Sequence, residues 1–279
     1  GAKLAEKGGY GWYTLIHELG HAMGLKHPGA YNAGGGSTPG PYLPKPLDNR
    51  STSVMSYNNP AASTIVSLTG TATDTSYTLR TSTAASIPST YQALDIAALQ
   101  YLYGANTNTQ TNALAVTDAY SKFETVWAPK GVELNAADTT RSNLFDLRGG
   151  GYSSISVRTE VSNLANFKSQ LKSQGFNDAK ANVAASSVMS SLKAKKADAT
   201  LYNGKNSLAL SYGSQYTKVA GGKAADKFYA GTYSTELNGG DGVDTLYLQG
   251  TVKDWVIDRA AGSAAAKSGG AVITFSNIE

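Results

Sequence analysis

The chain has 279 residues, enough for one large or two medium-sized domains, and 41% of them are hydrophobic, enough for a packed core. No apolar run approaches the length of a membrane span, and a chain without cysteine has no disulfides. The net charge of +4 is only weak evidence for nucleic-acid binding. We therefore expect no nucleic-acid partner and assign the lysines of residues 168–227 to a solvated face.

The first predicted element is a helix over residues 10–23, which carries an apolar stripe at helical spacing. Residues 17–27 follow the pattern H-E-x-x-H-x-x-G-x-x-H. On a helix, His17 and His21 stand one turn apart on the same face, so both imidazoles can reach one metal ion. Gly24 lets the chain leave the helix through a backbone shape that a side chain resists, and the turn brings His27 round as a third ligand.

Three nitrogen ligands with an open fourth position predict a catalytic zinc site rather than a closed structural one. Glu18, next to the first ligand, is placed to accept a proton from a water at the metal. The alternative is a helix with two core or surface histidines and an unrelated loop histidine. We favour zinc because the chain has only three histidines and all of them lie in this pattern.

A loop rich in Gly and Pro, residues 24–50, leads to Ser53-Val54-Met55-Ser56-Tyr57. A zinc helix followed by such a methionine turn resembles the metzincin peptidases. The flanking residues are most similar to the serralysin branch, at residues 10–11, 27–34, 53–57 and 94–106. The resemblance implies that Met55 is an apolar floor beneath zinc, and that Tyr57 both ligates zinc and hydrogen-bonds the tetrahedral intermediate. The alternatives are a methionine in core packing and a tyrosine packed on a loop.

This resemblance covers most of residues 10–106, and it implies a twisted sheet and a further helix upstream of the zinc helix. The chain begins only about ten residues before that helix. We therefore expect residues 1–106 to form the C-terminal part of a metzincin zincin-like catalytic domain. A missing N-terminal segment or a companion chain is expected to complete it.

A second helix is predicted over residues 88–103, with Pro88 before it, Ser89 or Thr90 as its cap and Gly104 as its stop. Asp95 suits the positive end of this helix, so we expect structural support from it rather than catalysis. The residues expected to face the core are Leu94, Ala97, Ala98, Tyr101 and Leu102.

Residues 107–279 change character, because Thr, Asn, Ser and Gly alternate with apolar residues as they do in strands. We expect a β-rich domain here, with strands near residues 143–148 and 152–158. Apolar residues at helical spacing between 161 and 198 predict two surface helices inserted into that domain.

A nine-residue period predicts a short, degenerate parallel β-roll at residues 203–250. Residues 239–247 match the calcium-binding repeat G-G-x-G-x-D-x-U-x, and residues 221–229 are a worn copy. Eighteen residues make one coil, so Asp226 and Asp244 should lie on adjacent rungs and share calcium with backbone carbonyls near Gly221 and Gly239. Phe228, Leu237 and Leu246 should point inward. The alternative is a Gly-Asp turn in a plain β-sandwich.

The sequence thus predicts an α+β protein with one catalytic zinc and few structural calcium ions. The favoured function is a secreted, extracellular zinc endopeptidase that cleaves protein or peptide substrates, with the secretion of Gram-negative bacteria implied by the resemblance. The alternative is a calcium-stabilised surface or S-layer-associated protein that retains a metzincin core without significant peptidase activity.

Overall fold

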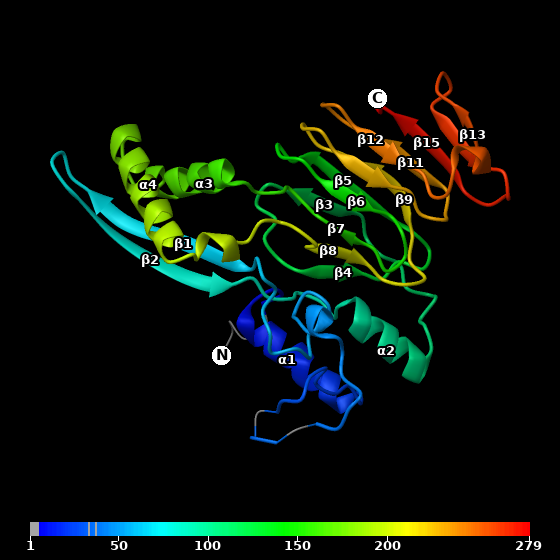
Figure 1. The fold of residues 1–279 in the computed structure, drawn as a ribbon, viewed down its shortest axis with the longest axis horizontal. Helices are drawn as coiled ribbons and strands as arrows, with labels where there is room; N and C mark the ends of the chain where they lie inside the picture. The colour runs from blue at the N-terminus through cyan, green and yellow to red at the C-terminus, as the bar shows by residue number, and fades with distance from the viewer. Residues whose placement is uncertain (1–5, 33, 37) are drawn as a thin grey trace. The chain divides into compact units, whose positions relative to one another are not determined.

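The computed structural model describes residues 6–32, 34–36 and 38–279, and it mixes helices with several β-sheets (Figure 1). The chain divides into two compact units. The first comprises the described residues of 1–59, 87–157 and 204–279, and the second comprises residues 60–86 and 158–203. No helix in the described part of the chain is both long and apolar enough to cross a bilayer.

The helical part of the first unit consists of α1 (Tyr10–Ala22), the 3-10 turn η2 (Lys45–Leu47) and α2 (Ala93–Tyr103). Helix α1 ends close to the predicted residue, and Gly24 adopts a φ of +89°, a region that L side chains rarely occupy. The N–H of Leu25 then donates to the carbonyl of Gly20, which reverses the chain towards His27.

Helix α2 differs from the prediction in its start and in its buried face. It begins at Ala93, because Gln92 and Asp95 form a capping box there, so neither Ser89 nor Thr90 is its cap. Tyr101 is 90% exposed and Leu102 51% exposed, so the expectation that they face the core is wrong. Apolar spacing identified a helix correctly but did not determine which of its apolar side chains are covered.

The β part of the first unit contains three sheets, with strand orders β12-β10-β6, β13-β14-β15-β11-β9-β5-β3 and β4-β8-β7. Most neighbouring strands are parallel, and they run side by side in Figure 1. A 3-10 turn, η4 (Val252–Asp254), precedes β13. The strands are β3 (Leu114–Thr117), β4 (Glu124–Val126), β5 (Val132–Asp138), β6 (Leu144–Asp146), β7 (Tyr152–Ser153), β8 (Leu208–Leu210), β9 (Tyr216–Ala220), β10 (Lys227–Tyr229), β11 (Thr235–Asn238), β12 (Thr245–Tyr247), β13 (Trp255–Asp258), β14 (Ser263–Ala266) and β15 (Val272–Ser276).

The pairing register follows the sequence period. Phe228 in β10 pairs with Leu246 in β12, and Val219 in β9 pairs with Leu237 in β11. Each pair is eighteen residues apart, twice the apolar repeat. Phe228 and Leu237 are at most 1% exposed, and Leu246 packs against the same core cluster. The side chain of Phe228 also stacks on Phe145 of β6, with ring centroids 5.0 Å apart.

The second unit is a β-hairpin covered by helices. Strands β1 (Thr64–Ala72) and β2 (Tyr77–Ala85) pair in antiparallel fashion, and α3 (Glu160–Lys172), α4 (Asp178–Ala194) and the turn η3 (Asp198–Thr200) complete the unit. Its core joins Val66 and Leu68 of the hairpin to Phe167 and Leu171 of α3. The two helices expected between 161 and 198 are present, whereas the hairpin was not predicted.

The side-chain amides of Gln170, in α3, and Gln174, just after α3, cover the outer edge of β1. The N–H groups of Leu68 and Gly70 donate to the side-chain oxygens of Gln170 and Gln174, at 2.9 and 2.8 Å. The amide nitrogens of these glutamines donate to the carbonyls of Val66 and Leu68. The two glutamines therefore satisfy a strand edge that otherwise presents open backbone groups.

Candidate metal centre

The three histidines of the chain converge on one point. Nε2 of His27 lies 3.3 Å from Nε2 of His17 and 3.1 Å from Nε2 of His21. One ligand atom from each ring lies within 4.8 Å of the others. His17 and His21 come from successive turns of α1, and His27 reaches them because Gly24 reverses the chain after the helix. The structure thus brings all three predicted ligands together.

On each histidine, a backbone carbonyl contacts the Nδ1 atom, opposite the Nε2 atom that points to the common centre. Nδ1 of His17 lies 2.8 Å from the carbonyl of Val54, Nδ1 of His21 lies 2.9 Å from that of Leu25, and Nδ1 of His27 lies 3.1 Å from that of Tyr31. Since a carbonyl only accepts, each Nδ1 carries the proton, and each Nε2 presents a lone pair to the common centre. This is the arrangement that metal-ligating histidines require.

The electrostatic environment also favours neutral imidazoles. Burial lowers the pKa of His17 and His27 below the usual 6.5, and it outweighs the opposing effect of their carbonyl contacts. Mutual repulsion with His21 lowers both pKa values further. A neutral ring is the form that binds a metal, so these shifts keep the cluster ready for a cation near neutral pH.

Glu18 follows His17 on α1, and its side chain is exposed. Its negative charge raises the pKa of both His17 and His27, although burial has the larger effect on each. Its carboxylate is therefore close enough to the cluster to act on it electrostatically while remaining open to water.

Met55 packs directly beneath α1. Its side chain is 1% exposed and belongs to a small core with Tyr13, Ile16 and Val54. A Cβ at Gly20, on the helix between His17 and His21, would lie only 2.6 Å from the sulfur of Met55. The methionine therefore fills the space that this glycine leaves.

Tyr57 lies over the histidine rings. Its ring stacks on His17, with centroids 5.7 Å apart and planes 23° apart, and is tilted against His27 at 4.5 Å. The ring of Tyr57 also stacks on Tyr31, with centroids 5.1 Å apart and planes 26° apart. Tyr57 is 38% exposed, so its position over the cluster leaves part of the ring accessible to solvent.

Asp95 joins the methionine turn to α2. Its buried carboxylate accepts hydrogen bonds from the hydroxyl of Ser53 and from the N–H groups of Val54 and Gln92, at 2.6, 2.7 and 2.9 Å. Burial raises its pKa to about 6, against the opposing effect of these donors. The sequence predicted that Asp95 supports the start of the helix. It did not predict the contact between Asp95 and the turn that bears Met55.

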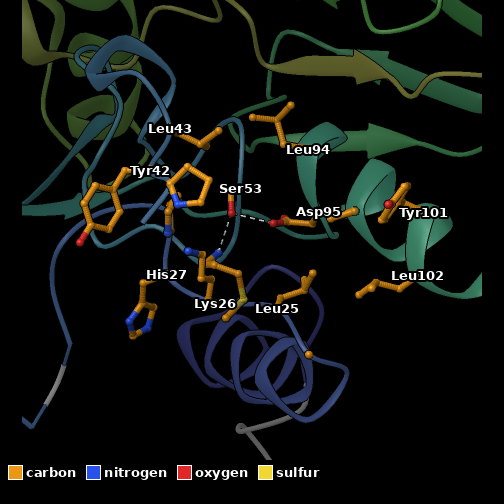
Figure 2. Close-up of a pocket in the computed structure, with 15 residues that line it drawn as sticks. Leu25, Lys26, His27, Tyr42, Leu43, Ser53, Leu94, Asp95, Tyr101 and Leu102 are labelled. Carbon is orange, nitrogen blue, oxygen red and sulfur yellow. Dashed lines mark hydrogen bonds between the residues drawn. The ribbon is translucent and has the colours of Figure 1, made fainter. Parts of the chain in front are cut away.

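A cavity of about 450 Å³ opens beside this junction, between the end of α1, the methionine turn and α2. Its lining is mainly apolar and includes Leu25, Leu43, Leu94 and Leu102. Figure 2 shows Ser53 and Asp95 facing each other across their hydrogen bond at this cavity.

The second predicted site lies at a turn edge of the parallel strands. The N–H of Asp226 donates to Oδ1 of Asp244 at 2.7 Å, and the carboxylate of Asp226 accepts from the N–H groups of Gly222 and Asn143. Oδ2 of Asp244 is buried without a hydrogen-bond partner among the described residues. Burial raises the pKa of Asp226 to about 6, and it also raises that of Asp244.

Gly221 and Gly239 lie against these two carboxylates. A Cβ at Gly221 would lie 2.6 Å from Oδ2 of Asp226, and a Cβ at Gly239 would collide with Oδ2 of Asp244. Each position therefore needs a glycine for the aspartate to fit. The predicted residues come together beside the neighbouring parallel strands β10 and β12, although the oxygens of Asp226 already accept backbone N–H groups.

The geometry defines a protein with an H-E-x-x-H histidine triad over a buried methionine. No family model matches the chain. It is 35% identical over 172 residues to serralysin of Proteus mirabilis, 32% over 151 residues to serralysin C of Dickeya chrysanthemi, and 36% over 108 residues to metallopeptidase AprA of Pseudomonas marginalis. These relatives confirm the resemblance to serralysin-type metzincins and, with the histidine triad, imply a metal.

The similarity is partial on both sides. The matches cover 56%, 50% and 39% of this chain, but only 31%, 27% and 20% of the respective relatives. The chain therefore spans about a third of the length of the Proteus mirabilis protein, and less of the other two.

Two contributors to the centre were not predicted. Tyr31 contacts both His27 and Tyr57, and Asp48 holds the hydroxyl of Tyr31 at 2.6 Å. The only sequence signal was the place of Tyr31 four residues after His27, within a segment that carried the serralysin resemblance.

Proposed function

We propose that this chain provides the zinc-binding part of a secreted endopeptidase of serralysin type, which acts on protein or peptide substrates. The observation that carries the proposal is the convergence of three Nε2 atoms while each Nδ1 donates to a carbonyl. These donors fit zinc, which takes imidazole nitrogen and keeps an open position in its catalytic sites. His17, His21 and His27 would hold the ion.

Zinc, when bound, supplies Lewis acidity that makes water a nucleophile near neutral pH and polarises a peptide carbonyl. Glu18 accepts the proton of the attacking water and delivers it to the leaving amine, a role that suits an exposed carboxylate beside the ligands. Tyr57, whose ring stacks on His17, donates a hydrogen bond from its hydroxyl to the oxyanion. The phenolic oxygen of Tyr57 would also help to hold the ion in the resting state. Met55 gives the ligands an apolar support.

The test is Glu18→Gln in the full chain, assayed for zinc content and for cleavage of unfolded casein. We expect zinc to remain bound while turnover falls about 10²- to 10⁴-fold, because the proton acceptor is lost and the ligands are not. Glu133→Gln, the same change at an exposed position on β5, is the matched control and should keep full activity. Undiminished cleavage by Glu18→Gln would refute the mechanism. Zinc binding without casein cleavage by the whole protein that contains this chain would favour the surface-protein alternative.

We also propose a calcium site between the rungs that carry Asp226 and Asp244. The buried, unpartnered Oδ2 of Asp244 and the glycines that make room for both carboxylates support a cation there. Carbonyls near Gly221 and Gly239 would complete an oxygen shell. Calcium at this site would stabilise the stacked turns and take no part in the chemistry at zinc.

A further inference from the structure

Tyr31 lies at the centre of the aromatic cluster, yet the proposed mechanism does not use it. The ring of Tyr57 stacks on both Tyr31 and His17, with centroids 5.1 and 5.7 Å apart. Tyr31 is also tilted against His27, with centroids 5.6 Å apart. Tyr31 therefore contacts both Tyr57 and one of the histidines that Tyr57 covers.

The hydroxyl of Tyr31 is tied to the segment that carries Tyr57. It donates to Oδ1 of Asp48 at 2.6 Å, and the same oxygen accepts from the hydroxyl of Ser56 at 2.7 Å. Asn58 donates to Oδ2 of Asp48 at 2.9 Å. The residues before and after Tyr57 are thus held by the carboxylate that holds Tyr31. The N–H of Tyr57 points to the Tyr31 hydroxyl, at a longer 3.4 Å.

Gly29 shows that the position of this ring is tightly limited. A Cβ there would collide with the ring of Tyr31 and would lie 2.7 Å from Oδ2 of Asp48. Gly29 leaves room where Tyr31 and Asp48 approach the backbone, so a methyl group at position 29 would disturb both side chains.

We infer that Tyr31, anchored by Asp48, is a positioning residue that sets where the Tyr57 ring rests relative to the histidine cluster. The inference rests on the role of Tyr57 in the proposed function. Tyr31 acts through its ring and hydroxyl on Tyr57, while its carbonyl separately orients His27. Replacing its hydroxyl leaves that carbonyl in place, so the two effects can be separated.

The experiment is a double-mutant cycle between Tyr31→Phe and Tyr57→Phe in the full chain. One readout is kcat and KM for peptide cleavage. The other is the phenolate-to-copper charge-transfer absorption of the copper(II)-loaded protein, which requires Tyr57 near the metal and needs no turnover. Tyr103→Phe is the matched control, because its exposed hydroxyl also makes one hydrogen bond, to the carbonyl of Met23.

We expect Tyr31→Phe to lower kcat about three- to tenfold with little change in KM, as loss of one anchoring hydrogen bond predicts. The copper absorption should weaken in parallel, and neither readout should change further when Tyr31→Phe is added to Tyr57→Phe. Gly29→Ala, which pushes the ring and keeps both hydroxyls, should weaken the same absorption. It serves as the second variant if Tyr31→Phe fails to fold.

Equal losses in both backgrounds would overturn the inference, because Tyr31 would then act independently of Tyr57. The inference would also be overturned if Tyr31→Phe gave the same kcat and copper absorption as the control Tyr103→Phe. A wild-type copper spectrum identical to that of Tyr57→Phe would overturn it as well. If the whole protein that contains this chain cleaves no peptide, the proposed function is refuted instead, and the copper cycle still decides whether Tyr31 positions Tyr57.

Discussion

In calcium-free buffer, the stability of the first unit should depend on pH through Asp226. This side chain is 1% exposed, and burial raises its pKa from 3.8 to about 6. The folded state therefore binds the proton more tightly than the unfolded chain does. The contribution to stability is complete below about pH 4 and is lost as the pH rises through about 6. A difference of about 2 in pKa corresponds to about 3 kcal/mol.

The assay is urea unfolding at several pH values between about 4 and 7, in calcium-free buffer with zinc held constant, for the wild type and Asp226→Asn. An amide does not titrate, so the wild type should lose about 3 kcal/mol relative to the variant across this range. The difference between the two proteins is the measure, because carboxylates other than the neighbouring Asp244 contribute equally to both. Added calcium should reverse the trend, since a cation favours the ionised carboxylate. A difference that stays constant with pH would refute the reasoning.

Three further outcomes are expected. Phe228→Ala should reduce the free energy of unfolding by about 3–5 kcal/mol in urea titrations, because it empties a fully buried site. Tyr233→Ala, at a 43% exposed position, should change it by less than about 1 kcal/mol. Equal effects of the two variants would contradict the assigned core. Gln170→Ala should destabilise the second unit by about 1–3 kcal/mol, because the N–H of Leu68 loses its acceptor. Faster amide hydrogen exchange in β1 measures this loss. Ser169→Ala, at an exposed position on the same helix, should leave the exchange unchanged. Tyr57→Phe should keep zinc and cleave casein more slowly, and an unchanged kcat would count against its role.

Local sequence indicated the histidine cluster and the repeat register. His17 and His21 share a face because a helix turns every 3.6 residues, and a glycine at position 24 allows the reversal that delivers His27. Similarly, a nine-residue period can bury Phe228 and Leu246 together only if strands eighteen residues apart are neighbours. In each case the interacting groups are close in sequence, or their spacing repeats.

The remaining features depend on contacts between distant segments. Whether Tyr101 is covered depends on what packs against α2, and the structure leaves it 90% exposed. Asp95 reaches Ser53, forty-two residues earlier, and Tyr31 meets Asp48 and Tyr57 only after the intervening loop has folded back. A single sequence without a repeat contains no local signal for such pairs.

The second unit is the clearest example of what only tertiary structure decided. Residues 64–85 form a hairpin and residues 160–194 form two helices, but neither segment carries a sequence signal that it packs against the other. They combine because each has an apolar face too small to form a core alone, and Val66 and Leu68 bury theirs against Phe167 and Leu171. The sequence by itself indicated the three histidines and the nine-residue repeat, whereas packing between segments distant in the chain decided the rest.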